Sequence, residues 1–268
     1  MRKKVIALAM IAAMVVSLTA CGGKNNDKQG KDSTESLKVA YQSGIAYAPI
    51  LVMKDQKLIE KNYDGNVDID WQLLSGGAAI SEGLTSNTVD VGAIGTGVAI
   101  TGAKAGAPYK IFAGMSSQPY RISTNKEEIK TLKDITKEDQ IAITGINSQP
   151  HIVLAMAAKA YLGDAHALDA NLVAQPNADG YTSLVSGAVQ CHMIMSPYCF
   201  MEQNKEGIHQ IEVDESVWPV GDTTIVGVAT EKLKEERPKL YEAVCKAMDE
   251  AIEFINDNPE NIAITTIF

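Results

Sequence analysis

The residues best suited to chemistry are small hydroxyl, amide and glycine residues that follow apolar, strand-like runs. They form four groups: Ser43-Gly44, Ser75-Gly76-Gly77, Gly95-Thr96-Gly97 and Asn147-Ser148. Each group precedes a helical pattern, so it supplies a hydroxyl or a free backbone N–H at a helix N-terminus, where the helix dipole adds partial positive charge. A single group is better explained as a helix cap. The repetition shifts the balance toward a site that binds an anion without a cationic side chain.

Other kinds of chemistry are poorly supported by the residue spacing. The glycines of residues 92–97 form GxxGxG rather than the dinucleotide-binding GxGxxG, and neither GxxxxGK[ST] nor GxSxG occurs. The four histidines form no HxH or HExxH pair. His192 lies beside Cys191 and near Cys199, but the apolar run CHMIM favours a core strand over a metal site. The sequence therefore predicts no enzyme, no metal site and no cofactor.

The elements that would position these groups alternate between strand-like and helical patterns. Strands are expected at 37–42, 67–74, 89–94, 110–115, 140–145, 170–175, 191–196 and 223–230. Helices are expected at 49–61, from 77, at 96–104 with Thr96 as its cap, at 127–135, 150–162 and 179–187, from 238, and again after Asn258. This alternation predicts βαβ units and mainly parallel sheets, whose strand ends bring the four groups to one crevice.

The N-terminus carries the pattern of an export signal. Three basic residues, Arg2 to Lys4, precede an uncharged apolar run that ends in Leu-Thr-Ala-Cys, which is similar to the lipobox of bacterial lipoproteins. We therefore expect a signal peptide over residues 1–20 and lipidation of Cys21. Residues 21–36 are almost devoid of apolar side chains and are expected to form a flexible tether.

Length and charge limit the remaining possibilities. A chain of 268 residues exceeds the size at which one hydrophobic core tends to split, so two lobes are expected. The 24 Lys and Arg residues include three in the signal peptide, which leaves 21 against 33 acidic residues in the mature chain. An excess of about 12 negative charges is unsuited to binding nucleic acid.

Four segments carry a resemblance to a known family. They are YAPILVMKDQKLIEK, SGGAAISEGLTSNTVDVGAIGTGVAI, ITGINSQPHIVLAMAAKAYLG and LVSGAVQCHMIMSPY. The second is similar to a glycine-led helix followed by a G-x-[IV]-D-x-G strand, and the fourth to L-x-x-G-x-V-D-A with an x-x-P-Y end. In this order, from about Leu37 onward, the chain resembles the solute-binding lipoproteins of ABC importers in the nitrate, sulfonate and taurine group. That group includes binders of thiamine-precursor pyrimidines.

The resemblance implies an α/β, two-lobed fold of the periplasmic-binding-protein type II class, each lobe a mainly parallel sheet flanked by helices. Residues 37–117 would begin lobe one, 118–218 would form lobe two, and 219–268 would return to lobe one, with two crossover hinges. A ligand would lie between the lobes. Eleven residues would hold it: Ser43, Gly44, Tyr47, Gly76, Gly77, Thr96, Gly97, Ser148, Gln149, Pro197 and Tyr198.

The resemblance also implies a location and partners. The protein would be anchored by its lipid to the outer face of the bacterial cell membrane, with no other contact with the membrane. It would act as a monomer that captures a small anion, first an organosulfonate and otherwise a nitrate- or bicarbonate-like anion. It would deliver this ligand to an ABC permease and its ATPase.

Departures from the family pattern keep other ligands open. Gln190 replaces the family's aspartate, and Ser196 replaces an acid before the Pro-Tyr pair, which argues against the amine recognition that taurine needs. Tyr47, Trp71 and Tyr198 could instead stack on a neutral aromatic such as a thiamine-precursor pyrimidine. A pyrimidine-synthesising enzyme of this fold is disfavoured because CHMIMSPYC lacks its cysteine-rich cluster. The family also continues for several tens of residues further, so the C-terminus is expected to be incomplete.

Overall fold

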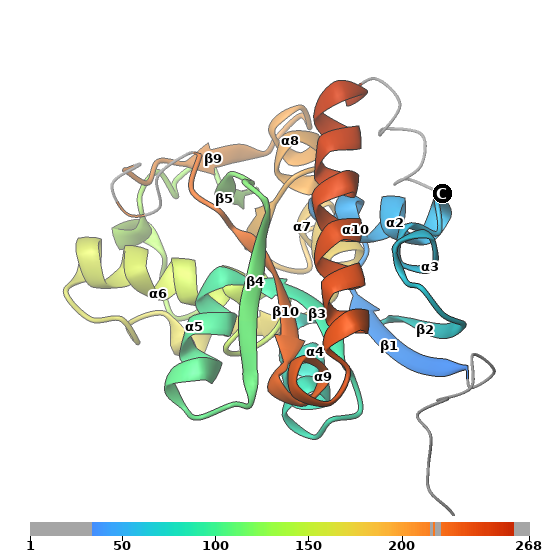
Figure 1. Ribbon diagram of the computed structural model, residues 1–268. Coiled ribbons are helices and arrows are strands. Elements are labelled where there is room, and N and C mark those ends of the chain that lie inside the picture. The colour runs from blue at the N-terminus through green and yellow to red at the C-terminus, as the bar shows by residue number, and fades with distance from the viewer. Residues whose placement is uncertain (1–33, 215–216, 218–220, 260–268) are drawn as a thin grey trace, which may run out of the picture. The chain divides into compact units, whose positions relative to one another are not determined.

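The computed structural model describes residues 34–214, 217 and 221–259 (Figure 1). The expected signal peptide, the lipidation site Cys21 and nearly all of the tether lie outside the described residues. So does most of the helix expected after Asn258. Two five-stranded sheets with helices on their faces confirm the α/β class. Of the helices in the described ranges, none is long and apolar enough to cross a membrane.

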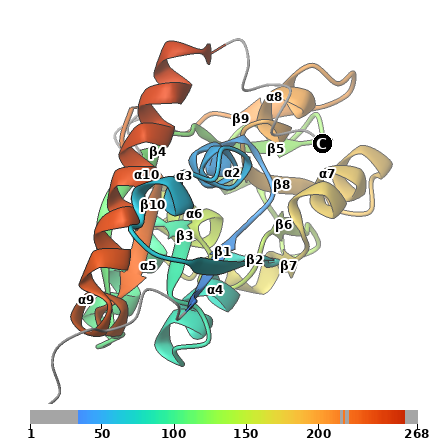
Figure 2. The ribbon, with the colours of Figure 1, turned by 45° about the vertical axis from the view of Figure 1, so that its right-hand side comes forward.

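The first sheet has the strand order β2-β1-β3-β10-β4. Its strands are β1 (Glu35–Tyr41), β2 (Val67–Leu73), β3 (Val91–Gly95), β4 (Tyr109–Ser116) and β10 (Ile225–Thr230). Helices α2 (Ala48–Asp55), α3 (Leu58–Asn62) and α10 (Pro238–Asp257) pack against one another, as Figure 2 shows, while α4 (Gly77–Thr85) and α5 (Thr96–Lys104) pack against β3 and β10. The 3₁₀ turn η2 (Ile45–Tyr47) precedes α2, and α9 (Glu231–Glu236) precedes α10. We call this sheet with its helices lobe one.

Both faces of the central strands of lobe one are buried, which explains their continuous apolar sequence. On β1, Val39 belongs to the core beneath α2 and α10, whereas Ala40 belongs to the core beneath α4 and α5. On β10, Ile225 and Val226 divide in the same way. A strand covered on both faces has no polar alternation, because every side chain meets apolar neighbours.

Gly92 is required where α4 crosses β3. A β-carbon added at Gly92 would lie 2.5 Å from Ile80 Cγ2 on α4, closer than packed atoms approach. Gly92 therefore lets the helix approach the strand closely, which is one reason for a glycine inside a strand. Replacing Gly92 by alanine should lower the free energy of unfolding by about 1–3 kcal/mol, because overpacking a filled core forces its neighbours apart.

Chemical denaturation of the two proteins would check this prediction. Gly76→Ala is the matched control, because its added β-carbon would have no neighbour closer than 4.0 Å. Equal losses of stability in both variants would contradict the packing explanation.

The second sheet has the strand order β7-β6-β8-β5-β9. Its strands are β5 (Tyr120–Thr124), β6 (Ile141–Ile143), β7 (Leu172–Ala174), β8 (Cys191–Met195) and β9 (His209–Ile211). Its helices are α6 (Gln149–Leu162), α7 (Asn177–Ser186) and α8 (Tyr198–Gln203), with the 3₁₀ turns η3 (Leu132–Asp134) and η4 (Asp169–Asn171). We call this sheet with its helices lobe two.

The expectation of mainly parallel sheets is wrong in part. Strands β1, β2 and β3 pair in parallel, as do β6, β7 and β8. However, β10 runs antiparallel to β3 and β4, and β5 runs antiparallel to β8 and β9. Both β5 and β10 enter their sheets directly from the other lobe rather than through a βα crossover, so nothing imposes the parallel direction.

Several short elements also differ from the sequence prediction. Strands β5 and β9 and helix α8 were not expected, because each is at most six residues long and has weak periodicity. Residues 127–135, expected to form a helix, form only the 3₁₀ turn η3. That turn is held by a capping box between Thr131 and Asp134, in which local side-chain hydrogen bonds replace helical ones.

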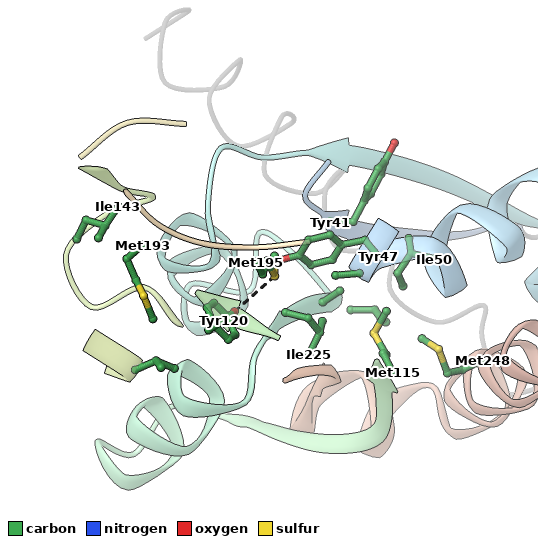
Figure 3. Packing of buried hydrophobic residues seen from close by; sticks show 14 of the residues in the cluster. Tyr41, Tyr47, Ile50, Met115, Tyr120, Ile143, Met193, Met195, Ile225 and Met248 are labelled. Carbon is green, nitrogen blue, oxygen red and sulfur yellow. Dashed lines mark hydrogen bonds between the residues drawn. The ribbon is translucent and has the colours of Figure 1, made fainter. Parts of the chain in front are cut away.

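The largest core cluster contains residues from both lobes. Tyr47 and Met115 come from lobe one, whereas Tyr120 and Met195 come from lobe two. Figure 3 shows Tyr47 pointing toward Tyr120 and Met195, and the Tyr120 hydroxyl lies 3.5 Å from Met195 Sδ. Burial, followed by the nearby Tyr47, raises the pKa of Tyr120 well above its ordinary value. The lobes are therefore joined by packed side chains where the chain crosses between them.

Candidate functional site

Two of the glycine groups of lobe one lie next to residues of lobe two. The backbone N–H of Gly97 donates a hydrogen bond to Oε1 of Gln149, with 2.7 Å between the nitrogen and the oxygen. A β-carbon added at Gly76 would lie 4.0 Å from the carbonyl oxygen of Thr144. The strand ends named from the sequence thus face each other across the two lobes.

Helix α5 begins differently from the sequence prediction. Thr96 was expected to cap it, but the N-cap is Gly95 and no side chain caps the helix. The Thr96 hydroxyl instead donates to the carbonyl of Thr223 (2.7 Å), and its backbone N–H donates to the carbonyl of Thr224 (2.9 Å). Thr96 therefore holds the returning chain just before β10, and its hydroxyl is already engaged as a donor.

Gln149 of lobe two contacts the start of α5. It is the first residue of α6 and only 4% exposed. A β-carbon added at Gly95 would lie 2.4 Å from Gln149 Cβ, and one added at Gly97 would lie 3.0 Å from Gln149 Oε1. The two glycines of lobe one therefore form a slot that the Gln149 side chain fills. Its Nε2 is buried and has no hydrogen-bond partner among the described residues.

The remaining lobe-one residues surround the end of β1. Ser43 is exposed, and Gly44 has φ +122°, a backbone conformation that favours glycine. Tyr47 is 2% exposed, and its burial raises the pKa of its hydroxyl, partly offset by a hydrogen bond with the Gln42 side chain. A β-carbon added at Gly77 would lie 3.8 Å from Gln42 Nε2. The groups after β1 and before α4 are therefore adjacent.

The remaining lobe-two residues have separate environments. Ser148 is buried and caps α6, because its hydroxyl accepts a hydrogen bond from His151 N at 3.4 Å. Pro197 is exposed, and Tyr198 packs beside Tyr181 with 6.0 Å between the ring centroids. Trp71, considered for stacking, lies on the edge strand β2.

Sequence reasoning missed a further polar group, in the junction between β7 and α7. Gln175 Oε1 and Asn177 Oδ1 are buried and have no hydrogen-bond partner within the described part of the chain. The backbone N–H of Gln175 bonds to Ile143 O at the end of β6, so this group lies beside the junction that leads to Gln149. The run Gln-Pro-Asn directly after an apolar strand was the signal available in the sequence.

The cavities of the described residues include two that none of the eleven predicted residues lines. One of 330 Å³ lies between α4, α5 and the start of α6, where Ser81, Thr101 and Asn147 line it. Another of 460 Å³ lies against β5 and α6 in lobe two, with Tyr120, Tyr161 and Glu212 among its lining residues.

The environment of His192 tests the prediction that CHMIM is a core strand. It is fully buried on β8, and its Nδ1 lies 2.5 Å from Glu202 Oε1 on α8. Cys191 and Cys199 are buried free thiols. The core-strand interpretation of CHMIM is confirmed, and His192 is paired with a carboxylate that the sequence analysis did not connect to it.

The sequence profile of the NMT1-like family matches residues 30–267. The chain belongs to the NMT1-like family. No curated protein gives a significant sequence match.

Solved structures with the same fold are similar to this NMT1-like chain over most of its length. The periplasmic aliphatic sulphonate binding protein SsuA from Escherichia coli is 21% identical, with a TM-score of 0.64, over 87% of this chain and 78% of that one. The nitrate-binding protein NrtA from Synechocystis PCC 6803 is 16% identical, with a TM-score of 0.68, over 87% and 66%.

A third structure, the alkanesulfonate-binding protein SsuA from Xanthomonas axonopodis pv. citri bound to MOPS, is 18% identical. Its TM-score is 0.67, over 86% of this chain and 78% of that one. At these identities the likeness establishes a shared periplasmic-binding-protein fold for this NMT1-like chain. All three proteins are named as binding proteins rather than enzymes.

Proposed function

We propose that this chain is the extracytoplasmic solute-binding component of an ABC importer. It captures a small anion between its lobes, first an organosulfonate and otherwise a nitrate- or bicarbonate-like anion, and delivers it to the permease and its ATPase. Closure of the lobes around the ligand is the change that the permease reads. Cys21 would carry the lipid that keeps the protein at the outer face of the membrane.

One observation carries this proposal. The N-terminus of α5 already binds an oxygen, since the Gly97 N–H donates to Gln149 Oε1 at 2.7 Å with no cationic side chain in the contact. A sulfonate or nitrate oxygen is a stronger acceptor than an amide oxygen and is favoured further by the helix dipole. The named ligands of the SsuA and NrtA neighbours agree with this chemistry.

A second candidate, a neutral aromatic ligand with N–H groups, is favoured by a different observation. Gln175 Oε1 and Asn177 Oδ1 are acceptors without a donor, and buried acceptors disfavour an anion. A thiamine-precursor pyrimidine would supply N–H donors to them. Of the aromatic residues proposed to stack, Tyr198 lies beside the ring of Tyr181.

A thermal-shift panel of sulfonates, nitrate, bicarbonate and pyrimidines tests both candidates. A ligand at 100 times its dissociation constant stabilises the folded state by about 2.7 kcal/mol. For a folded part of this size, we expect the melting temperature to rise by about 5–10 °C. A rise with ethanesulfonate supports the anion, and a rise with pyrimidines alone replaces it with the neutral ligand. No rise with any compound would contradict both.

A further inference from the structure

We propose that Gln149 is a displaceable internal ligand. Its side-chain amide occupies the N-terminus of α5 when no solute is bound, and a solute oxygen takes its place on loading. This inference rests on the proposed function for the loading step only. The contact itself lies between two residues of the chain, since Gly97 N and Gln149 Oε1 are 2.7 Å apart.

The Gln149 side chain fits closely against two glycines of lobe one. It passes between Gly95 and Gly97, where added β-carbons would lie 2.4 Å from its Cβ and 3.0 Å from its Oε1. Ile152, one turn further along α6, would lie 3.0 Å from the β-carbon added at Gly97. Two missing side chains in lobe one therefore match one present side chain in lobe two.

The contact is also incomplete, which makes it displaceable. Gln149 is 4% exposed, yet its Nε2 has no partner in the described ranges of the chain. A buried donor left without an acceptor opposes the contact that holds it. A solute oxygen that enters the slot would replace Oε1 at Gly97 and release Nε2 to water. Gln149 thus sets the affinity by competing for the same N–H.

The first arm of the test needs no solute. The first N–H groups of a helix normally lack a partner and exchange freely, so slow exchange at Gly97 reports the Gln149 contact. In Gln149→Met, which keeps the length of the side chain but removes its amide, we expect Gly97 to exchange at least about tenfold faster by NMR. Gln203→Met on the exposed end of α8 is the matched control and should leave Gly97 unchanged.

The second arm uses ethanesulfonate as the probe and calorimetry as the readout. Removal of the competing amide should tighten binding about tenfold in Gln149→Met. Unchanged or weaker binding would overturn displacement, and equal Gly97 exchange in both proteins would overturn the contact. If ethanesulfonate binds neither protein, the sulfonate proposal fails while the exchange arm still decides the role of Gln149. Gln149→Leu repeats both arms if the methionine variant does not fold.

Discussion

Replacing Glu202 by leucine should lower the free energy of unfolding by about 3–5 kcal/mol, because it leaves the buried His192 without its partner. Both side chains are fully buried, and Nδ1 of His192 lies 2.5 Å from Oε1 of Glu202. The pair joins β8 to α8, and the Pro197-Tyr198 junction lies between the two paired residues in sequence. Loss of the pair should therefore also loosen the part of the candidate site that contains Pro197 and Tyr198.

The double variant separates the pair from simple packing. With His192→Leu and Glu202→Leu together, no buried polar group is left unpaired, and much of the lost stability should return. His192 Nε2 and Glu202 Oε2 already lack partners among the described residues, which favours the apolar replacement. Urea denaturation measures the free energy of unfolding of the two single variants and of the double variant, with Glu206→Leu on the surface as control. A double variant no more stable than Glu202→Leu would show that the pair is not the cause.

Replacing Asp139 by asparagine should lower the free energy of unfolding by about 2–3 kcal/mol at neutral pH. The Asp139 side chain is 1% exposed and accepts hydrogen bonds from Lys126 Nζ (2.6 Å), Thr136 N (2.8 Å) and Thr136 Oγ1 (2.8 Å). An asparagine NH₂ in this place would meet donors. The loop leads directly into β6 and the junction that contains Gln149, so its order supports the site.

The effect of Asp139→Asn should depend on pH in a definite direction. Burial raises the pKa of Asp139, but the hydrogen bonds from Lys126 and Thr136 outweigh it and hold the pKa below its ordinary value. The stabilisation is therefore present above the pKa of this carboxyl in the unfolded chain, about 3.9. It is lost as the pH falls through the lower pKa of the carboxyl in the folded protein. The difference between wild type and variant should narrow below about pH 4. Glu138→Gln, at an exposed neighbour, should not show this narrowing.

The long, strongly patterned elements could be predicted from the sequence. Helix α10 follows the spacing of Leu240, Val244 and Met248, and all three are buried. Strand β8 was predicted from CHMIM with nearly the observed bounds. The short elements β5, β9 and α8 could not be predicted, because three to six residues carry too little periodicity. Their place is decided by distant partners: β5 pairs with β8, β9 pairs with β5, and α8 packs against β5 and β8.

The candidate site was predictable as a set of strand ends but not as a set of contacts. The group after β3 indicated Gly97 and the family resemblance indicated Gln149, but nothing local in the sequence shows that one binds the other. Thr96 was misjudged for the same reason, since its partner Thr223 lies 127 residues away. Gln175 and Asn177 were missed because their signal, the run Gln-Pro-Asn after a strand, is also typical of an ordinary turn.

The position of β10 between β3 and β4 determines the order in which the molecule can be completed. All strands of lobe two lie within residues 120–211, so that sheet is complete as soon as this stretch of chain is available. The lobe-one sheet must wait for residues 225–230, and until then β3 and β4 each expose an unpaired edge in what will be the interior. A chain emerging N-terminus first therefore finishes its second lobe before its first.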